Sequence, residues 1–215
     1  MLTPTIIRGG AARRPPRPES PRHTTVINDA ALVEKPTLHS PLVTLVPLSA
    51  RHGEPMWQAG LDEETNRLTG TRRAFTREEI QDWCTTRPDQ PDRLDLAIED
   101  PATGRFLGEL ALNCLDRDNA SASFRIALTP DSTGRGIGTA ATRLLLRHAF
   151  EAVRLHRVSL EVYDYNPRAA RVYEKAGFTL EGRARQAHHW DGRFHDVLHM
   201  AALRDEWLAA HDTPH

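Results

Sequence analysis

The sequence predicts a mixed α/β fold, built on a central, mostly antiparallel sheet with one parallel pair of strands and helices on its faces. Two observations predict this class. Strand-like runs at 94–99, 106–114 and 122–128 follow one another with only short polar turns between them, which indicates an antiparallel meander. A strongly amphipathic helix then precedes a strand at 157–163, and such a strand, helix, strand unit makes a parallel crossover.

The chain ahead of the meander is expected to form a strand and two helices. The β-rich run at 42–48 predicts the strand, and a first helix follows Ser49. Thr76 and Glu79 have the spacing of a capping box, in which each side chain bonds the backbone N–H of the other. They predict the start of the second helix, with Trp83 facing inward.

The chain after the meander is expected to hold two helices and a closing hairpin. Apolar residues recur every three or four positions over 137–152, which predicts the strongest helix. Asn166 is a good N-cap for the next helix, because Pro167 then occupies the first helical position. The Asp-Gly pair at 191–192 predicts the turn of the hairpin.

Length and composition fit one domain with tails. The 215 residues are short for two enzymatic domains, and the 39% hydrophobic and 27% charged residues are ordinary for a soluble globular protein. Residues 1–38 are rich in Pro, Arg, Gly and Ser, which favours a disordered arm. We therefore expect a folded domain at 39–210 and a tail at 211–215.

Charge and cysteine content restrict the partners and the compartment. The 28 Lys and Arg nearly balance the 29 Asp and Glu, so no global field attracts nucleic acid or anionic lipid. The arginine-containing start has no apolar segment of a secretory signal, and no run approaches the roughly 18 apolar residues of a membrane helix. Cys84 and Cys114 lack metal or disulfide spacing and are predicted to be buried free thiols. We expect a cytoplasmic protein that binds neither nucleic acid nor membrane.

A glycine-rich segment at 133–139 stands at the start of the strongest helix. Free backbone N–H groups and the helix dipole favour an anion there, and glycines let a phosphate approach the backbone closely. A mononucleotide loop would need Gly-Lys-Ser/Thr, which is missing. A dinucleotide fits the spacing of Gly136, Gly138 and Ala141, but its fold requires repeated parallel units. The third class of ligand is coenzyme A, whose pyrophosphate needs the same N–H groups.

Two segments resemble motifs of the GNAT acetyltransferases, over about residues 42–202. STGRGIGTAATRLLLRHAF is similar to the family motif Q/R-x-x-G-x-G/A, with Thr133 in place of the usual Gln or Arg. LEVYDYNPRAARVYEKAGF, at 160–178, is similar to the family pattern LEV-x-x-x-N-x-x-A-x-x-x-Y-x-x-x-G-F. The end of the chain resembles the branch that acetylates ribosomal-protein N-termini and small amines. The resemblance implies acetyl-CoA as co-substrate, a sheet splayed at the parallel pair to admit it, and an amine acceptor on the opposite side.

The resemblance also implies the residues of the cofactor site. The backbone of the third meander strand would pair with the pantetheine arm, the glycine-rich loop would hold the pyrophosphate, and the helix after Asn166 would complete the site. The residues implied are Ile126, Ala127, Leu128, Thr133, Gly134, Arg135, Gly136, Ile137, Gly138, Thr139, Asn166, Arg168, Ala169 and Tyr173.

Acetyl transfer to an amine needs a base, an oxyanion site and a proton for the leaving thiolate. The resemblance places Tyr173 near the sulfur as general acid, although its helical stripe also fits a core aromatic. Glu161 alternates away from the apolar residues of its strand, and it is our leading general base, directly or through water. Glu109 is the second candidate, and its alternative is a solvated or salt-bridged carboxylate.

Several points stay open at this stage. His195 and His199 on one strand would stand about 13 Å apart, so no metal site is predicted. A homodimer is expected, with Trp207 and the hairpin around Trp190 as candidates to pack against a second copy. A non-catalytic acyl-CoA sensor or scaffold and a dinucleotide-binding protein are the alternatives. The acceptor, whether a protein N-terminus, polyamine, amino acid or antibiotic amine, is not encoded by any decisive motif.

Overall fold

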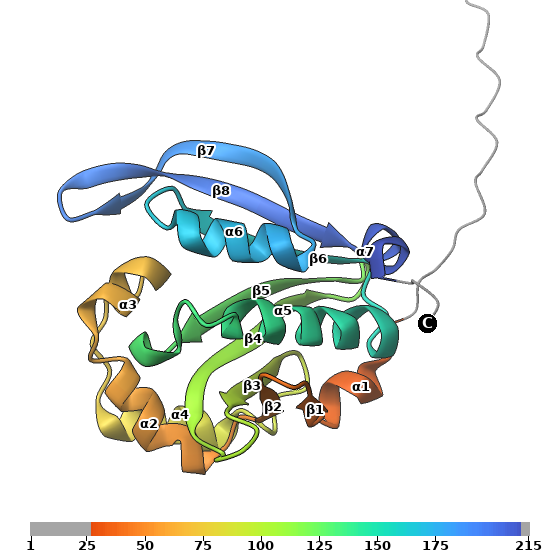
Figure 1. Ribbon diagram of the computed structural model, residues 1–215, viewed down its shortest axis with the longest axis horizontal. Coiled ribbons are helices and arrows are strands. Elements are labelled where there is room, and N and C mark those ends of the chain that lie inside the picture. The colour runs from red at the N-terminus through yellow and green to blue at the C-terminus, as the bar shows by residue number, and fades with distance from the viewer. Residues whose placement is uncertain (1–26, 212–215) are drawn as a thin grey trace, which may run out of the picture.

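The computed structural model describes residues 27–211, and within them the strands form one eight-stranded sheet of order β1-β2-β3-β4-β5-β6-β8-β7 (Figure 1). The strands are β1 (Leu38–His39), β2 (Thr44–Pro47), β3 (Leu94–Glu99), β4 (Phe106–Asp116), β5 (Ser121–Leu128), β6 (Arg157–Tyr163), β7 (Thr179–Trp190) and β8 (Arg193–Leu203). The helices are α1 (Asp29–Val33), α2 (Gly53–Ala59), α3 (Glu63–Thr69), α4 (Arg77–Thr86), α5 (Ile137–Arg147), α6 (Pro167–Ala176) and α7 (Arg204–His211), with a π-helical continuation of α5 at His148–Ala152.

The predicted meander is confirmed. β3, β4 and β5 pair antiparallel, with Ala97 opposite Glu109 and Glu109 opposite Ala127. Every residue of β3 is buried, as expected for a strand whose two faces are both covered by helices. Partners in a ladder point to the same face, so Glu109 and Arg125 share the face of Ala97.

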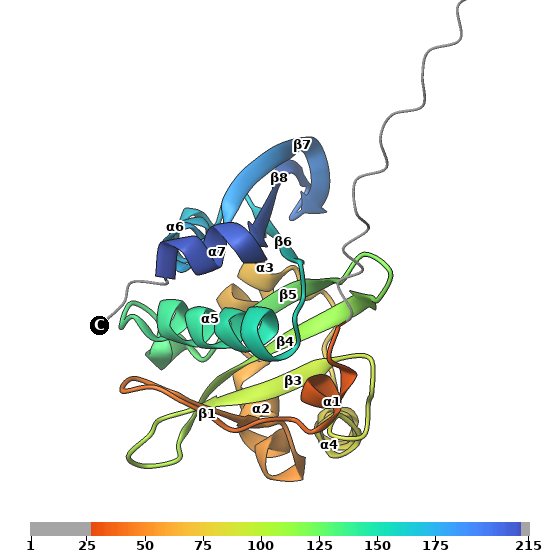
Figure 2. The same ribbon diagram turned by 90° about the vertical axis from the view of Figure 1, so that its right-hand side faces the viewer.

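Two hydrophobic layers cover the sheet. On one face, α5 buries a stripe that includes Ala141 and Leu145 against the larger core. On the other face, α4 contributes Cys84 to a smaller cluster with Ala97 and Phe106. Figure 2 shows α5 and α7 to one side of β3, β4 and β5. Because successive side chains of a strand point to opposite faces, they lie alternately on the α5 face and on the α4 face of the sheet.

The sheet splays where the parallel pair was predicted. β5 and β6 are paired only at Ser121↔Arg157, Ala122↔Val158 and Ser123↔Ser159. Beyond that seam β5 continues to Leu128 and β6 to Tyr163 without pairing to each other. This is the one parallel pair among the described strands, and it excludes a dinucleotide fold, which needs repeated parallel units. The α/β class with a splayed, mostly antiparallel sheet is confirmed.

Three expectations need correction. The folded part begins before the expected boundary at residue 39, because residues 29–33 form α1 and bury Leu32, while 1–26 and 212–215 lie outside the described residues. Cys84 is buried as predicted, but Cys114 is exposed, at a positive φ of 49° beside a break in the β4–β5 register. Trp207 packs inside its own chain, so it is not available to a second copy.

The burial of Trp207 has a simple cause. α7 turns back over the end of α5, so the indole ring meets Phe150 at a centroid distance of 5.7 Å, and its N–H donates to the Ala176 carbonyl at 3.1 Å. The sequence offered no helix prediction for α7. None of the helices within residues 27–211 is long and apolar enough to cross a membrane.

Candidate active site

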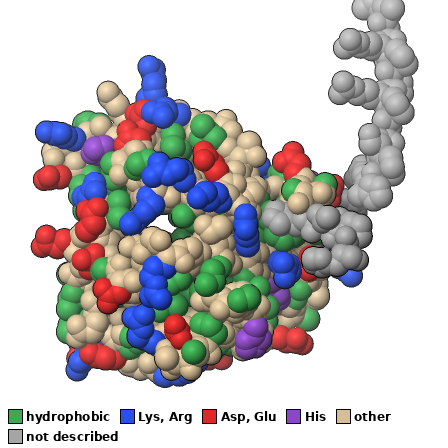
Figure 3. All heavy atoms as spheres, viewed as in Figure 1, with side chains coloured by type: hydrophobic (Ala, Val, Ile, Leu, Met, Phe, Trp, Pro, Cys, Tyr) green, Lys and Arg blue, Asp and Glu red, His purple; other side chains and the backbone are tan. Residues whose placement is uncertain are grey.

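A cavity of about 1340 Å³ occupies the splay. Residues of α2, α3 and α4 line one side of it, and residues of β4, β5, β6 and α6 line the other. Figure 3 shows the surface hollowed near its centre, with Lys and Arg side chains around the opening. The cavity is therefore bounded by both limbs of the sheet, the strands up to β5 and the strands from β6 onward, and it continues to the glycine-rich loop.

The loop has the backbone that an anion site requires. Gly134 and Gly136 adopt left-handed φ values of 78° and 80°, and Gly136 is the N-cap of α5. No side chain caps that end of α5, so its first N–H groups remain free for a ligand. Gly138 serves packing, because a Cβ there would lie 3.4 Å from Leu128 and 3.6 Å from Val172.

Most of the predicted cofactor residues meet at the cavity. Those that line it are Ile126, Ala127, Leu128, Thr133, Gly134, Gly136, Gly138, Thr139, Asn166, Arg168, Ala169 and Tyr173. Arg135 and Ile137 are not among the lining residues, and the Ile137 side chain is buried in the core, 4% exposed. The Thr133 hydroxyl donates to the Pro130 carbonyl at 2.9 Å, so it closes its own turn.

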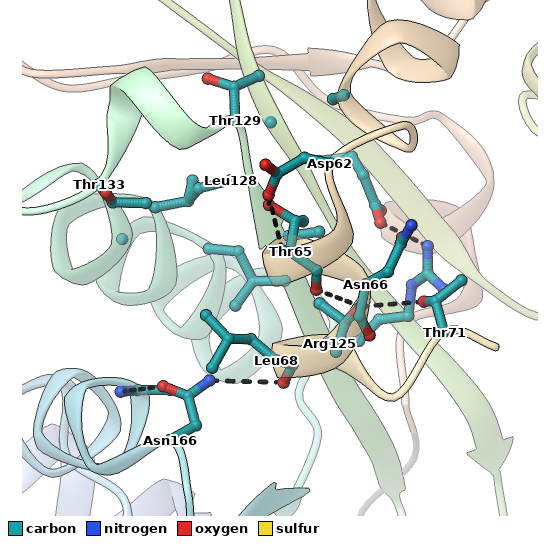
Figure 4. Close-up of a pocket in the computed structure, with 18 of the residues that line it drawn as sticks. Asp62, Thr65, Asn66, Leu68, Thr71, Arg125, Leu128, Thr129, Thr133 and Asn166 are labelled. Atoms are coloured by element: carbon teal, nitrogen blue, oxygen red, sulfur yellow. Dashed lines mark hydrogen bonds and ion pairs between the residues drawn. The ribbon is translucent and has the colours of Figure 1, made fainter. Parts of the chain in front are cut away.

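Asn166 is the N-cap that the sequence predicted. Its Oδ1 accepts from the Ala169 N–H at 3.1 Å, and its Nδ2 donates to the Leu68 carbonyl at 3.4 Å. Figure 4 shows this side chain reaching from the start of α6 to the end of α3. The Tyr165 hydroxyl donates to the Arg67 carbonyl at 2.9 Å, a second link between the same elements. α3 is thus fastened across the splay.

α3 was missed at the sequence level, although its caps carried a signal. Asp62 accepts from the Thr65 N–H at 2.7 Å, and Gly70 ends the helix in the left-handed conformation. Acidic residues in the first turn and Arg67 in the last suit the helix dipole. The helix has no buried residue, so it lacks the apolar period by which helices are recognised.

Tyr173 sits at the inner wall of the cavity. It is 8% exposed and packs edge-on against Phe124 at a centroid distance of 6.1 Å. Burial disfavours the phenolate and raises the pKa of Tyr173 to about 12. The hydroxyl therefore stays protonated at neutral pH, as a hydrogen-bond or proton donor must.

The two candidate bases occupy different settings. The Glu161 side chain is 66% exposed, lines the cavity from β6, and has its Oε1 3.5 Å from Nδ1 of its cross-strand neighbour His199. The Glu109 side chain is 8% exposed and accepts from Arg125 Nη2 at 2.5 Å. Glu109 thus fits its alternative prediction as a salt-bridged carboxylate, whereas Glu161 is open to solvent and substrate.

The histidines lie near the hairpin. His188 stacks on Tyr163 at a centroid distance of 3.9 Å, and burial lowers the pKa of His188. His195 Nδ1 lies 3.3 Å from Asp164 Oδ1. Within the described part of the chain, no group of three His, Cys, Asp or Glu side chains is placed to hold a metal ion.

The chain is similar in sequence to curated acetyltransferases. YdaF of Bacillus subtilis (strain 168), whose name assigns it provisionally to ribosomal N-acetylation, is 35% identical over 104 residues, which span 48% of this chain and 57% of YdaF. Spermidine N(1)-acetyltransferase of Escherichia coli (strain K12) is 28% identical over 131 residues, which span 57% of this chain and 70% of that enzyme. The chain thus spans little more than half the length of YdaF.

Solved structures share the fold. A GCN5-related N-acetyltransferase from Brucella melitensis superposes with a TM-score of 0.69 at 28% identity, over 82% of each chain. Spermidine N-acetyltransferase from Vibrio cholerae, solved with CoA and spermine, gives a TM-score of 0.73 at 22% identity, over 79% of this chain and 99% of that one. The model of the acetyltransferase (GNAT) domain matches residues 43–179. The chain therefore belongs to the GNAT acetyltransferase family.

Proposed function

We propose that the protein transfers an acetyl group from acetyl-CoA to a primary amine by direct attack, without an acyl-enzyme. The observation that carries this proposal is the cavity itself. It joins an uncapped helix N-terminus at the glycine-rich loop, a stretch of β5 that is not paired to β6 and a protonated buried tyrosine. Family membership supports the same reaction and the same donor.

The residues present fit coenzyme A. The N–H groups at the start of α5 and the left-handed Gly134 and Gly136 would hold the pyrophosphate. The end of β5, at 126–128, is not paired to β6, so its backbone is available to the amide groups of the pantetheine arm. The coenzyme would supply a thioester, an activated acyl group with a thiolate as leaving group.

We assign Glu161 as the base that removes the proton from the acceptor amine. Its exposed carboxylate lines the cavity, and the Nδ1 atom of His199 lies 3.5 Å from its Oε1. A backbone N–H of β5 at Ile126 or Leu128 would donate to the carbonyl oxygen as its charge grows. Attack forms the C–N bond, and collapse of the tetrahedral adduct breaks the C–S bond.

We assign Tyr173 to the departing sulfur. A thiol has a pKa of about 8.5, so full proton transfer from a phenol of pKa about 12 is uphill. The hydroxyl therefore acts as a hydrogen-bond donor that offsets the negative charge on the departing sulfur, and the released thiolate takes its proton from solvent. Glu109 is already paired with Arg125, which makes it the weaker candidate for the base.

Binding and turnover test the proposal in one sample. The purified protein is titrated calorimetrically with acetyl-CoA, with NAD and ATP as controls, and thiol release is then followed on adding a panel of amines. Gly136→Trp should weaken acetyl-CoA binding, because the position requires a left-handed backbone at the loop. Gly104→Trp is the matched control, since Gly104 has a φ of 70° in open space and does not line the cavity.

The outcomes separate the alternatives. Acetyl-CoA binding followed by amine-dependent thiol release supports the transferase. Binding without release for any amine supports the acyl-CoA sensor or scaffold. Binding of NAD but not acetyl-CoA contradicts the coenzyme assignment.

We also propose a homodimer in the cytoplasm. The hairpin of β7 and β8 leaves Leu180 52% and Phe194 64% exposed, and these side chains are candidates for the interface now that Trp207 is accounted for. Sedimentation velocity on the wild type and on Phe194→Ser tests this proposal. If the variant sediments as a dimer like the wild type, the interface does not include Phe194.

A further inference from the structure

Two buried polar atoms beside the cavity lack a partner. Within residues 27–211, neither Glu109 Oε2 nor Trp83 Nε1 forms a hydrogen bond. Folded proteins keep few such atoms, because a buried donor or acceptor left unpaired costs stability. Trp57 provides the contrast, since it lines the same cavity but its N–H donates to the Phe75 carbonyl at 3.2 Å. The two unpaired atoms point to a ligand.

Both residues line the cavity, Glu109 from β4 and Trp83 from α4. Glu109 and Arg125 share the face of the sheet that α4 covers, and Trp83 belongs to α4. All three line the cavity. Glu109 uses Oε1 to accept from Arg125, which leaves Oε2 as an acceptor without a donor.

The Trp83 ring is held in place. The guanidinium of Arg87 lies 4.0 Å and that of Arg93 5.1 Å from the ring centroid. Arg93 is itself fixed by two hydrogen bonds to Asp95, of 2.5 and 2.7 Å. A ring fixed in this way presents its N–H in one direction, so Trp83 is a preorganised donor.

Among the residues that line the cavity, the unpaired atoms are one acceptor and one donor, and the unpaired Nε of Arg87, which stacks on Trp83, adds a second donor next to them. A protonated polyamine carries N–H donors only, so it could satisfy Glu109 but would leave Trp83 unpaired. An α-aminoacyl group carries an amine and, two bonds away, a carbonyl oxygen that can accept from an indole N–H. The neighbouring walls of Met56, Ile80 and Phe106 offer apolar surface for a small side chain.

We propose that Glu109 and Trp83 form a subsite that selects an α-aminoacyl acceptor and disfavours polyamines. The inference rests on the proposed transferase function and names the acceptor class of that same cavity. Both atoms are covered in the free protein. Arg125 is 43% exposed, so its side chain is the part that shifts when a ligand reaches Glu109.

The test compares amines with and without the carbonyl, and kcat/KM is expressed per neutral amine because an α-amino group has a pKa of about 8 and an alkylamine a pKa of about 10.4. Alaninamide and isopropylamine differ by one carboxamide in place of a methyl group, and spermidine and an alanine-initiated peptide complete the panel. We expect kcat/KM for alaninamide to exceed that for isopropylamine by about tenfold, the worth of one good buried hydrogen bond. Trp83→Phe removes only the N–H and should abolish most of that ratio. Trp57→Phe is the matched control and should keep the wild-type ratio, whatever its effect on the overall rate.

Glu109→Gln is the second variant, for the case in which Trp83→Phe does not fold. It keeps the shape of the side chain but removes the charge that receives the amine, so it should lower kcat/KM for alaninamide and isopropylamine alike, and an unchanged kcat/KM for both would count against the subsite. The alanine-initiated peptide distinguishes a protein N-terminus from a free amino-acid derivative as the natural acceptor. If the acceptor is a protein N-terminus, the peptide should be acetylated at least as efficiently as alaninamide.

Two further results would overturn the inference alone: turnover in which spermidine or isopropylamine matches alaninamide, or a Trp83→Phe enzyme with the wild-type ratio. Acetyl-CoA binding with no thiol release for any member of the panel would instead count against the transferase itself, and the inference would fail with it.

Discussion

Gly108 is the position where the structure makes its sharpest prediction about stability. Its φ is 152°, and a Cβ built there would lie 2.3 Å from the Ala127 carbonyl oxygen and 2.8 Å from the Leu128 Cα. Both are backbone atoms of β5, so no side-chain rotation can relieve the contact. Gly108→Ala must therefore push β5 away from β4 at the strand end that we assign to the coenzyme.

The expected cost has two parts. Placing a non-glycine residue in a strained backbone region costs about 1–3 kcal/mol, and overpacking a buried site costs about 1–3 kcal/mol more. We therefore expect the free energy of unfolding to fall by about 2–6 kcal/mol. With a urea m-value of about 2–3 kcal/mol/M, the midpoint should drop by about 1 M or more.

Urea denaturation followed by fluorescence measures this change, with Gly182→Ala as the control. Gly182 is also a strand glycine, but no atom lies within 4 Å of its Cβ direction and its φ is not positive. Its replacement should leave the midpoint unchanged or raise it slightly. Equal midpoints for the two variants would refute the steric argument, and a stable Gly108→Ala protein with normal acetyl-CoA affinity would refute the role of this strand end.

Three further predictions follow from single residues. Trp207→Ala should lower the free energy of unfolding by about 3–5 kcal/mol, because it removes a ring packed on Phe150; a urea midpoint equal to wild type would contradict that packing. Burial lowers the pKa of His52 below its unfolded value, so the folded state resists protonation and stability should fall as pH drops through about 6.5; melting temperatures at pH 5 to 8 check this, with a flatter profile expected for His52→Gln. Tyr173→Phe should lower kcat by about 10²-fold while the KM for acetyl-CoA stays near wild type, and an unchanged kcat would remove Tyr173 from the chemistry.

The features predicted correctly from the sequence are local ones. The Thr76 and Glu79 capping box is present with both of its hydrogen bonds, and Asn166 caps α6 through the Ala169 N–H. The turn at Asp191 and Gly192 has the two positive φ values that an Asp-Gly hairpin needs. Each depends on residues a few positions apart, so a single sequence is enough to find it.

The features that escaped prediction depend on residues distant in the chain. Arg125 reaches Glu109 only because β4 and β5 are in one particular register. Trp83 looked like an inward core residue, and the lack of a partner for its N–H appears only when the packing of α4 is known.

The short seam between β5 and β6 has a consequence for how the protein behaves in solution. The limbs of the sheet share three residue pairs, so the backbone amides beyond Ser123 and Ser159 lack cross-strand protection on the sides that face the splay. A coenzyme bound there would act as a surrogate strand between them. At 100 times its dissociation constant it would raise the free energy of unfolding by about 2.7 kcal/mol, so the abundance of the folded protein would follow the supply of acyl donor.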